Sequence, residues 1–187
     1  TILFVGAKRQ AQECVRGTAE RLNMPYMCER WLGGTLTNQR VVFSRVDYLK
    51  KLQAQEKEGA FETLPKKEVA GLMREMGKLQ SSLGGVMDMN KLPDALVVID
   101  VDRERIAVRE AAKLGIPIVA LVDSCSNPDL IDYVIPGNDD ALRSIKVIVD
   151  ALATAIEAGI GIAGKKIEKD ESAISEAVIG KLDEKVE

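Results

Sequence analysis

The chain has 187 residues, of which 46% are apolar and 29% are charged, a balance typical of a globular protein with one sizeable core. It contains no histidine, which removes the commonest general base and metal ligand, and its three scattered cysteines favour free thiols over a disulfide framework. The net charge of -3 hides an asymmetry: residues 1–80 carry 14 Lys+Arg against 9 Asp+Glu, and residues 81–187 carry 12 against 20. The acidic net charge therefore does not exclude a polyanionic partner that binds the basic first half. An ordinary fluctuation of surface charge explains the asymmetry equally well.

Short apolar runs alternate with helical patterns through most of the chain. The first run ends at Gly6 and is followed by a helix whose apolar residues recur every three or four positions. Residues 93–122 give the clearest strand–helix–strand pattern, with a helix over about 103–114 that ends at Gly115. Asn138 or Asp139 is expected to cap a further helix after the last strand. Continuous apolar strands between helices predict an α/β fold, a parallel sheet with helices on both faces. The expected strands are residues 2–5, 25–28, 95–99, 117–122 and 133–135.

The segment 38–82 interrupts this alternation, because it carries two helical patterns and no strand signal. Its apolar stripes are narrow, which favours an inserted, protruding antiparallel helical hairpin that packs mainly on itself over two ordinary helices lying flat on the domain. Thr63 is expected to cap the second helix, with Pro65 in its first turn. The predicted organisation is a discontinuous α/β domain of residues 1–37 and 83–164, the hairpin 38–82, and a polar, acidic tail of residues 165–187 that frays or awaits a partner.

Signatures of an enzyme are weak. The first strand–helix turn, GAKRQ, has one glycine where a dinucleotide fingerprint has three, and no Walker A motif occurs. Asp100, Asp102 and Asp123 are expected near the carboxyl ends of neighbouring strands, where open α/β sheets bind ligands, so they offer a cation or acid–base site. We favour capping of the following helices as their role. Lys8 and Arg9, at the amino end of a helix, suit either a bound phosphate or a solvated turn.

Several longer blocks occur together and in order: ILFVGAKRQAQE, RWLGGTLTN, and a run from LGGVMDMNKLPDALVVIDVDRER to PGNDDA. From residue 2 to about residue 159, the chain resembles the family of the second protein of the bacterial-type small ribosomal subunit. Two features depart from that family: its amino-terminal segment with a His-Phe-Gly-His-type block is missing, and Ser124-Cys125-Ser126 stands where Thr-Asn-Ser is commoner. Because the chain starts at Thr1 inside a strand pattern, we expect an upstream segment. The family signature comprises Pro93, Asp100, Glu104, Glu110, Gly115 and Pro117.

The resemblance implies a flavodoxin-like sheet with a protruding helical hairpin, and a structural, non-catalytic role in translation. We assign no cofactor and no metal-binding residue to the chain. It implies binding to small-subunit ribosomal RNA, near the neck between head and body, and to other small-subunit ribosomal proteins, including the messenger-binding protein one. No apolar run reaches the roughly 18 residues of a membrane span and no signal peptide is visible. We therefore expect no membrane partner. The resemblance implies a location on ribosomes, either in a cytoplasm or in an organellar stroma or matrix. The alternative is a flavodoxin-like domain that binds a nucleotide or phosphosugar at the carboxyl edge of the sheet.

The stretch RWLGGTLTNQR is interpreted, with this resemblance, as an anchoring turn. Gly33 and Gly34 can adopt positive φ, which lets the chain turn sharply out of the sheet. Trp31 is expected to fix that turn to the core rather than to stack on a base. Thr35 or Thr37 is expected to cap the first helix of the hairpin.

Exposed polar groups around this turn suit phosphate and 2′-OH recognition. The arginines of a later helix, Arg103, Arg105 and Arg109, share that helix with Glu104 and Glu110 and are expected to contribute much less. The expected RNA-binding residues are Lys8, Arg9, Arg30, Thr35, Thr37, Asn38, Arg40 and Arg45.

Overall fold

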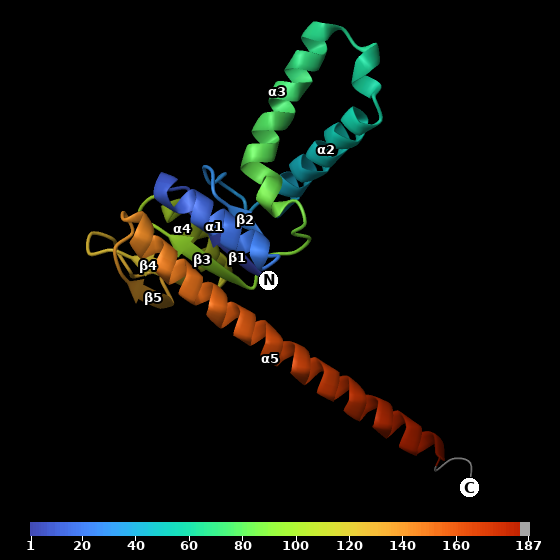
Figure 1. Ribbon diagram of the computed structural model, residues 1–187, viewed down its shortest axis with the longest axis vertical. Coiled ribbons are helices and arrows are strands. Elements are labelled where there is room, and N and C mark those ends of the chain that lie inside the picture. Colours follow the sequence, from blue (N-terminus) through green and yellow to red (C-terminus); the bar gives the residue numbers. More distant parts are fainter. Residues whose placement is uncertain (184–187) are drawn as a thin grey trace. The chain divides into compact units, whose positions relative to one another are not determined.

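Five parallel strands form one sheet in the order β2-β1-β3-β4-β5 (Figure 1). The computed structural model describes the backbone of residues 1–183 and the side chains of residues 1–61 and 63–162. This strand order is the flavodoxin-like arrangement and confirms the predicted α/β class; the topological switch point lies between the adjacent strands β1 and β3. The strands are β1 (Ile2–Val5), β2 (Tyr26–Met27), β3 (Ala95–Ile99), β4 (Ile118–Val122) and β5 (Tyr133–Pro136).

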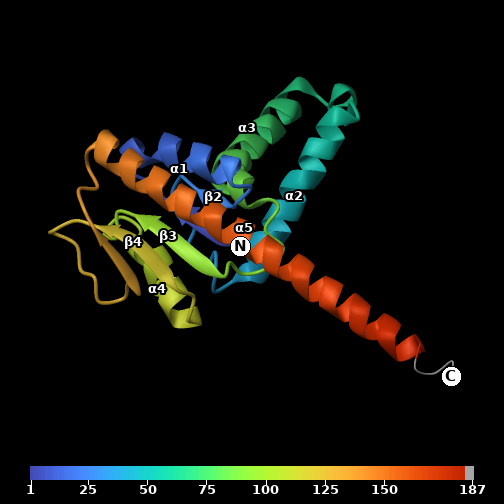
Figure 2. The same ribbon diagram turned by 60° about the horizontal axis from the view of Figure 1, so that its bottom comes forward.

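Three α-helices alternate with these strands: α1 (Arg9–Arg21), α4 (Arg105–Leu114) and α5 (Leu142–Asp183). Successive side chains of a strand point to opposite faces of a sheet, and both faces here are apolar. Leu3 of β1 belongs to a core cluster that includes Ala107 of α4. On the opposite face α1 approaches β1 closely, because a Cβ added at Gly6 would lie 3.2 Å from the side chain of Val15. Helices α1 and α4 therefore cover opposite faces of the sheet (Figure 2).

The inserted segment contains α2 (Gln39–Lys57), a short 3-10 helix η1 (Ala60–Thr63), α3 (Lys66–Leu83) and a second 3-10 helix η2 (Gly84–Val86). Two side-chain hydrogen bonds join the α-helices: Tyr48 donates to Glu75 (3.4 Å), and Gln53 donates to Gln80 (2.7 Å). The amino-terminal half of α2 packs in the core cluster, whereas Leu83 is the one buried residue of α3. That this helical pair projects as a separate unit stays a prediction.

The predicted helix caps of this segment are wrong. Helix α2 begins at Gln39, directly after Asn38, and no side chain caps it, so neither Thr35 nor Thr37 is its cap. Their hydroxyl groups donate to the carbonyl of Leu32 and to Glu110. Thr63 does not cap α3 either, since it lies inside η1 and α3 begins directly after Pro65. The hydroxyl groups of Thr35 and Thr63 donate to the carbonyls three residues before them, and only that of Thr37 has a distant partner, Glu110.

Helix α5 is preceded by an Asn138 side chain whose Oδ1 accepts the backbone N–H groups of Asp140 (3.0 Å) and Ala141 (2.7 Å). It then continues to Asp183 and includes residues 165–183, which the sequence analysis assigned to a tail. Glycines at 161 and 164 are compatible with this helix, because one glycine weakens a helix by only about 1 kcal/mol. Residues 184–187 of the expected tail lie outside the described part of the chain. The chain divides into two compact units, Thr1–Val149 and the residues from Asp150 onward.

Candidate nucleic-acid interface

One carboxylate organises the turn that follows β2. Glu110 lies on α4 and is only 8% exposed. Its Oε1 accepts the indole N–H of Trp31 (3.2 Å) and the backbone N–H of Gly34 (2.6 Å). Its Oε2 accepts the backbone N–H groups of Leu36 (3.0 Å) and Thr37 (3.1 Å) and the hydroxyl of Thr37 (3.2 Å). A single side chain thus holds four residues of the loop; we call residues 31–37 with Glu110 the clasped turn.

The backbone conformation of the clasped turn requires glycine at one of its two glycine positions. Gly34 has φ +92°, in the left-handed region that side chains other than glycine rarely adopt. Gly33 has no such φ, and a Cβ added there would meet nothing within 4 Å. Trp31 is 5% exposed and belongs to the core cluster, so its ring anchors one end of the turn while its N–H is satisfied by Glu110.

The electrostatics of Glu110 favour its charged form. Burial on its own would raise the pKa of this carboxyl, but the hydrogen bonds from Gly34, Thr37, Leu36 and Trp31 outweigh burial and lower the pKa below its ordinary value. The carboxylate is therefore ionised at neutral pH and attracts all five donors at once. Hydrogen bonds to a charged acceptor are stronger than neutral ones, so the clasped turn is a rigid element on the surface of the sheet domain.

The structure separates the expected RNA-binding residues into two groups. Thr37 is exposed within the clasped turn; Arg30, Asn38 and Arg40 are exposed and flank it, and Arg45 is exposed further along α2. Thr35 is fully buried, and its hydroxyl donates to the carbonyl of Leu32. Arg9 is exposed but begins α1, which covers the other face of the sheet from α4.

Lys8 lies at the carboxyl end of β1 and is surrounded by carboxylates. Its ammonium is 2.7 Å from Asp139, 2.6 Å from Asp140 and 3.2 Å from Asp100, and its side chain is only 12% exposed. Burial would lower the pKa of Lys8, but hydrogen bonds to the three aspartates outweigh it and raise that pKa above the ordinary value. A lysine thus occupies the switch point, where folds of this class bind their ligands.

Asp100 and Asp123 also make local hydrogen bonds at this edge. Asp100, which has φ +70°, accepts the backbone N–H of Arg103 (3.0 Å), and Asp123 accepts the backbone N–H of Ser124 (2.6 Å). Asp123, Asp139 and Asp140 have oxygens within 4.8 Å of one another, which is close enough to share a cation. Lys8 already provides the positive charge for Asp139 and Asp140, so the geometry is that of an internal ion pair.

Sequence reasoning missed the roles of two glutamates. Glu110 holds the clasped turn, and Glu104, 2% exposed, accepts the backbone N–H of Ala7 at 2.9 Å. Burial raises the pKa of Glu104, since it penalises the charged form more than the bond to Ala7 stabilises it. Both glutamates are three residues away from the buried Ala107, so they interrupt the apolar stripe of α4. A glutamate on an apolar stripe is the sequence signal that indicates an internal partner.

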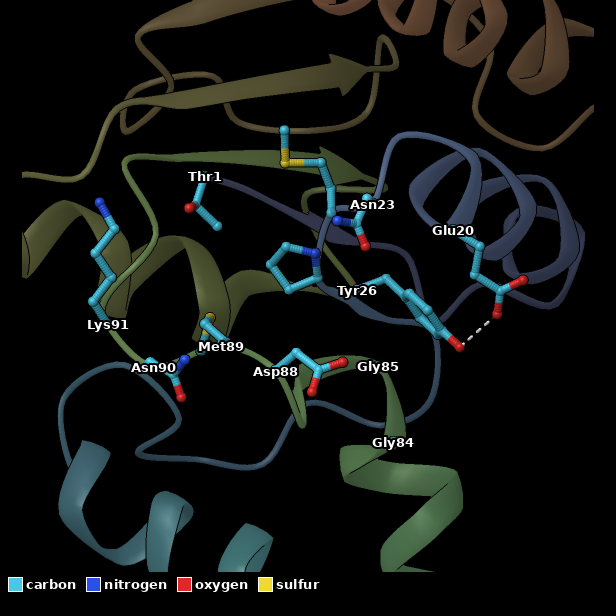
Figure 3. A pocket seen from close by; sticks show the side chains of 12 residues that line it. Thr1, Glu20, Asn23, Tyr26, Gly84, Gly85, Asp88, Met89, Asn90 and Lys91 are labelled. Atoms are coloured by element: carbon cyan, nitrogen blue, oxygen red, sulfur yellow. Dashed lines mark hydrogen bonds between the residues drawn. The ribbon is translucent and has the colours of Figure 1, made fainter. Parts of the chain in front are cut away.

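A cavity of about 550 Å³ lies near the amino ends of β1 and β2 (Figure 3). Its lining is mostly polar or small, and within it the hydroxyl of Tyr26 donates a hydrogen bond to Glu20 (2.8 Å). None of the expected RNA-binding residues lines it. The lining includes Asn23, Met24, Gly84, Gly85, Asp88, Met89, Asn90 and Lys91.

Among the described residues, no helix is long and apolar enough to cross a membrane. A comparison with protein families gives one clear result: residues 1–159 match the sequence model of the family described as Ribosomal protein S2. The matched region begins with β1 and includes the clasped turn, both inserted helices and the whole sheet.

Proposed function

The chain belongs to the ribosomal protein S2 family, a family of structural proteins of the small ribosomal subunit, and on this premise we propose that its clasped turn binds small-subunit ribosomal RNA. In this proposal the protein has no catalytic residue and acts in translation by positioning RNA and neighbouring proteins. The observation that carries the proposal is the clasp itself, because Glu110 fixes a loop that lies between the exposed Arg30 and Arg40.

The chemistry of the exposed rim suits a folded RNA. Arg30 and Arg40 supply two guanidinium groups on either side of the turn, and guanidinium groups recognise phosphates by bidentate hydrogen bonds. Asn38 adds an exposed amide that suits a ribose 2′-OH, and the hydroxyl of Thr37, which donates to Glu110, can still accept a hydrogen bond from one. A rigid rim loses little conformational entropy when it binds, which favours affinity. Lys8 and Thr35 are left out of the proposed rim because the first is held by carboxylates and the second is buried.

The carboxyl edge of the sheet argues against the alternative of a nucleotide or phosphosugar site. A phosphate placed at the switch point would meet the carboxylates of Asp100, Asp139 and Asp140, and Lys8, which lies between them, is already paired. A ligand would have to break these ion pairs before it could bind. We therefore favour RNA binding by the surface over binding of a small molecule by the edge.

Neighbouring proteins of the small subunit are further proposed partners, among them the messenger-binding protein one. The edge strand β5 supports a protein contact, since Tyr133 is 64% exposed and Val134 is 44% exposed. Exposed apolar side chains of this size on an edge strand are typical of surfaces that other proteins cover.

The experiment is a salt titration of binding between the purified protein and small-subunit ribosomal RNA. Replacing Arg30 and Arg40 by glutamate should weaken binding and reduce the slope of log K against log salt by about 0.7–0.9 for each phosphate that the variant no longer binds. The matched control replaces Lys66 and Lys67 on α3, which are equally exposed. Equal weakening in the two variants would refute the rim, and tight binding of a nucleotide or sugar phosphate by the parent protein would favour the alternative.

A further inference from the structure

The exposed surface of α4 carries positive charge alone. Arg105, Arg109 and Lys113 are exposed, whereas the two acidic residues next to them, Glu104 and Glu110, are 2% and 8% exposed. The three cations are spaced by four residues and therefore lie on one side of the helix, one above the other. We call these three residues the α4 basic strip. Arg103, also exposed, flanks it at the amino end of the helix.

Neither glutamate is available to neutralise the strip. Glu104 accepts the backbone N–H of Ala7, and Glu110 accepts the five donors of the clasped turn. Among residues with described side chains, none forms an ion pair with Arg105, Arg109 or Lys113. The expectation that Glu104 and Glu110 balance the arginines of this helix is therefore corrected: the glutamates belong to the interior and the cations to the surface.

Stability of the helix does not explain this pattern. Arg103 and Arg105 lie at the amino end of α4, where the helix dipole disfavours cations, and the first turn contains no acidic residue. Only Lys113, in the last turn, is placed where a cation stabilises the helix. Arg105, a cation at this unfavourable position without an ion-pair partner among the described side chains, indicates that an external anion compensates for it.

We infer that the α4 basic strip is a second contact with the backbone of small-subunit ribosomal RNA, next to the clasped turn. The inference rests on the proposed function. Four residues of α-helix rise by about 6 Å, similar to the separation of successive phosphates along a strand, so the strip can follow a backbone. Two of its three members are arginines, which bind phosphate by bidentate hydrogen bonds. Glu110 joins α4 directly to the loop, so both contacts belong to one rigid support.

The test neutralises the strip without disturbing the fold. The variant R105Q/R109Q/K113Q keeps residues of good helix propensity and leaves both glutamates in place. The matched control, K66Q/K67Q/R74Q, removes three exposed cations of α3, where Glu68 and Glu75 are exposed beside them. Both variants and the parent protein are titrated with small-subunit ribosomal RNA over a range of salt concentrations, after thermal melts establish that all three are folded.

We expect the strip variant to lower the salt slope by about 2–3, since it no longer binds three phosphates that contribute about 0.7–0.9 each, and to bind on the order of a hundred-fold more weakly at 0.1 M salt. The control should change both quantities much less. Equal effects of the two variants would overturn the inference while the proposed function stands, whereas a parent protein without affinity for the RNA would overturn the proposed function itself. Unchanged RNA affinity of the strip variant, with loss of its incorporation into small subunits, would assign the strip to an acidic protein and would also overturn the inference.

Discussion

Replacing Glu110 by glutamine removes the charge from the clasp while keeping the size of the side chain. The carboxylate accepts two donors on Oε1 and three on Oε2, and glutamine offers one oxygen and one NH₂ group. In the better of its two orientations, the amide oxygen faces the three donors of Leu36 and Thr37, and its NH₂ group faces the N–H groups of Trp31 and Gly34. Two donors in a largely buried place then lose their acceptor.

The magnitude follows from these two donors. A buried group left without a partner costs about 1–3 kcal/mol, so the loss is about 2–6 kcal/mol. Part of this loss is offset, because burying a neutral glutamine costs less free energy than burying a carboxylate. We therefore expect the Glu110→Gln protein to be destabilised by roughly 2–5 kcal/mol.

Urea denaturation measures this change, and the chain provides its own local probe. Trp31 is the only tryptophan, so its fluorescence reports on the clasped turn and circular dichroism reports on the whole fold. The control is Glu13→Gln, an exposed position of α1, for which we expect a change within about 0.5 kcal/mol. A Glu110→Gln protein with the parent's midpoint and the parent's tryptophan spectrum would refute the role of the clasp.

The dependence on pH has a defined sign. The pKa of Glu110 is lowered in the folded protein, so the stability that it contributes is present above the pKa of the unfolded state, about 4.3, and is lost as the pH falls through the folded value. The difference in stability between the parent and Glu110→Gln should therefore be constant near neutral pH and should shrink below about pH 4. Glu104, whose pKa is raised, is present in both proteins and cancels from this difference.

Four further substitutions test other parts of the same unit. Trp31→Ala should destabilise by roughly 3–5 kcal/mol, as expected for a large buried ring, and thermal melts should register this before RNA affinity changes at low temperature. Gly34→Val should destabilise by about 1–3 kcal/mol because its φ is +92°, whereas Gly33→Ala should stay within about 0.5 kcal/mol; urea midpoints of the pair measure the contrast. Lys8→Met should destabilise by roughly 2–4 kcal/mol at pH 7, less than the loss of a fully buried pair since Asp140 is 73% exposed; urea midpoints measure this loss.

The sheet could be predicted from the sequence because its signals are local. The apolar runs of β1, β3 and β4 lie between helical patterns and coincide with the observed strands within a residue. Strand β2 is shorter than expected, two residues instead of four, because only Tyr26 and Met27 pair with β1. Its length depends on where the pairing with β1 begins and ends, which periodicity within the segment does not report.

The polar contacts of the site could not be predicted, because their partners are distant in sequence. Thr37 was expected to cap the helix that follows it, and it donates instead to Glu110, 73 residues away. Lys8 was grouped with the phosphate-binding candidates, and its ammonium is bonded to Asp139, 131 residues away. Local pattern identifies which side chains carry charge, but only the fold determines whether a charge is satisfied inside the protein or faces the solvent.

The two glutamates of α4 and the cations beside them are consequences of one packing arrangement. In the linear sequence, Arg103, Glu104, Arg105, Arg109 and Glu110 form a nearly neutral segment. When this segment folds, its glutamates point inward and its arginines point to the solvent. The glutamates accept backbone N–H groups after β1 and in the clasped turn. Those N–H groups are donors that a carboxylate satisfies and that an apolar residue would leave unpaired. Because Glu104 and Glu110 are needed inside as acceptors, their negative charges are absent from the surface of the helix. The same packing that holds the loop therefore leaves the exposed cations without acidic neighbours along the helix.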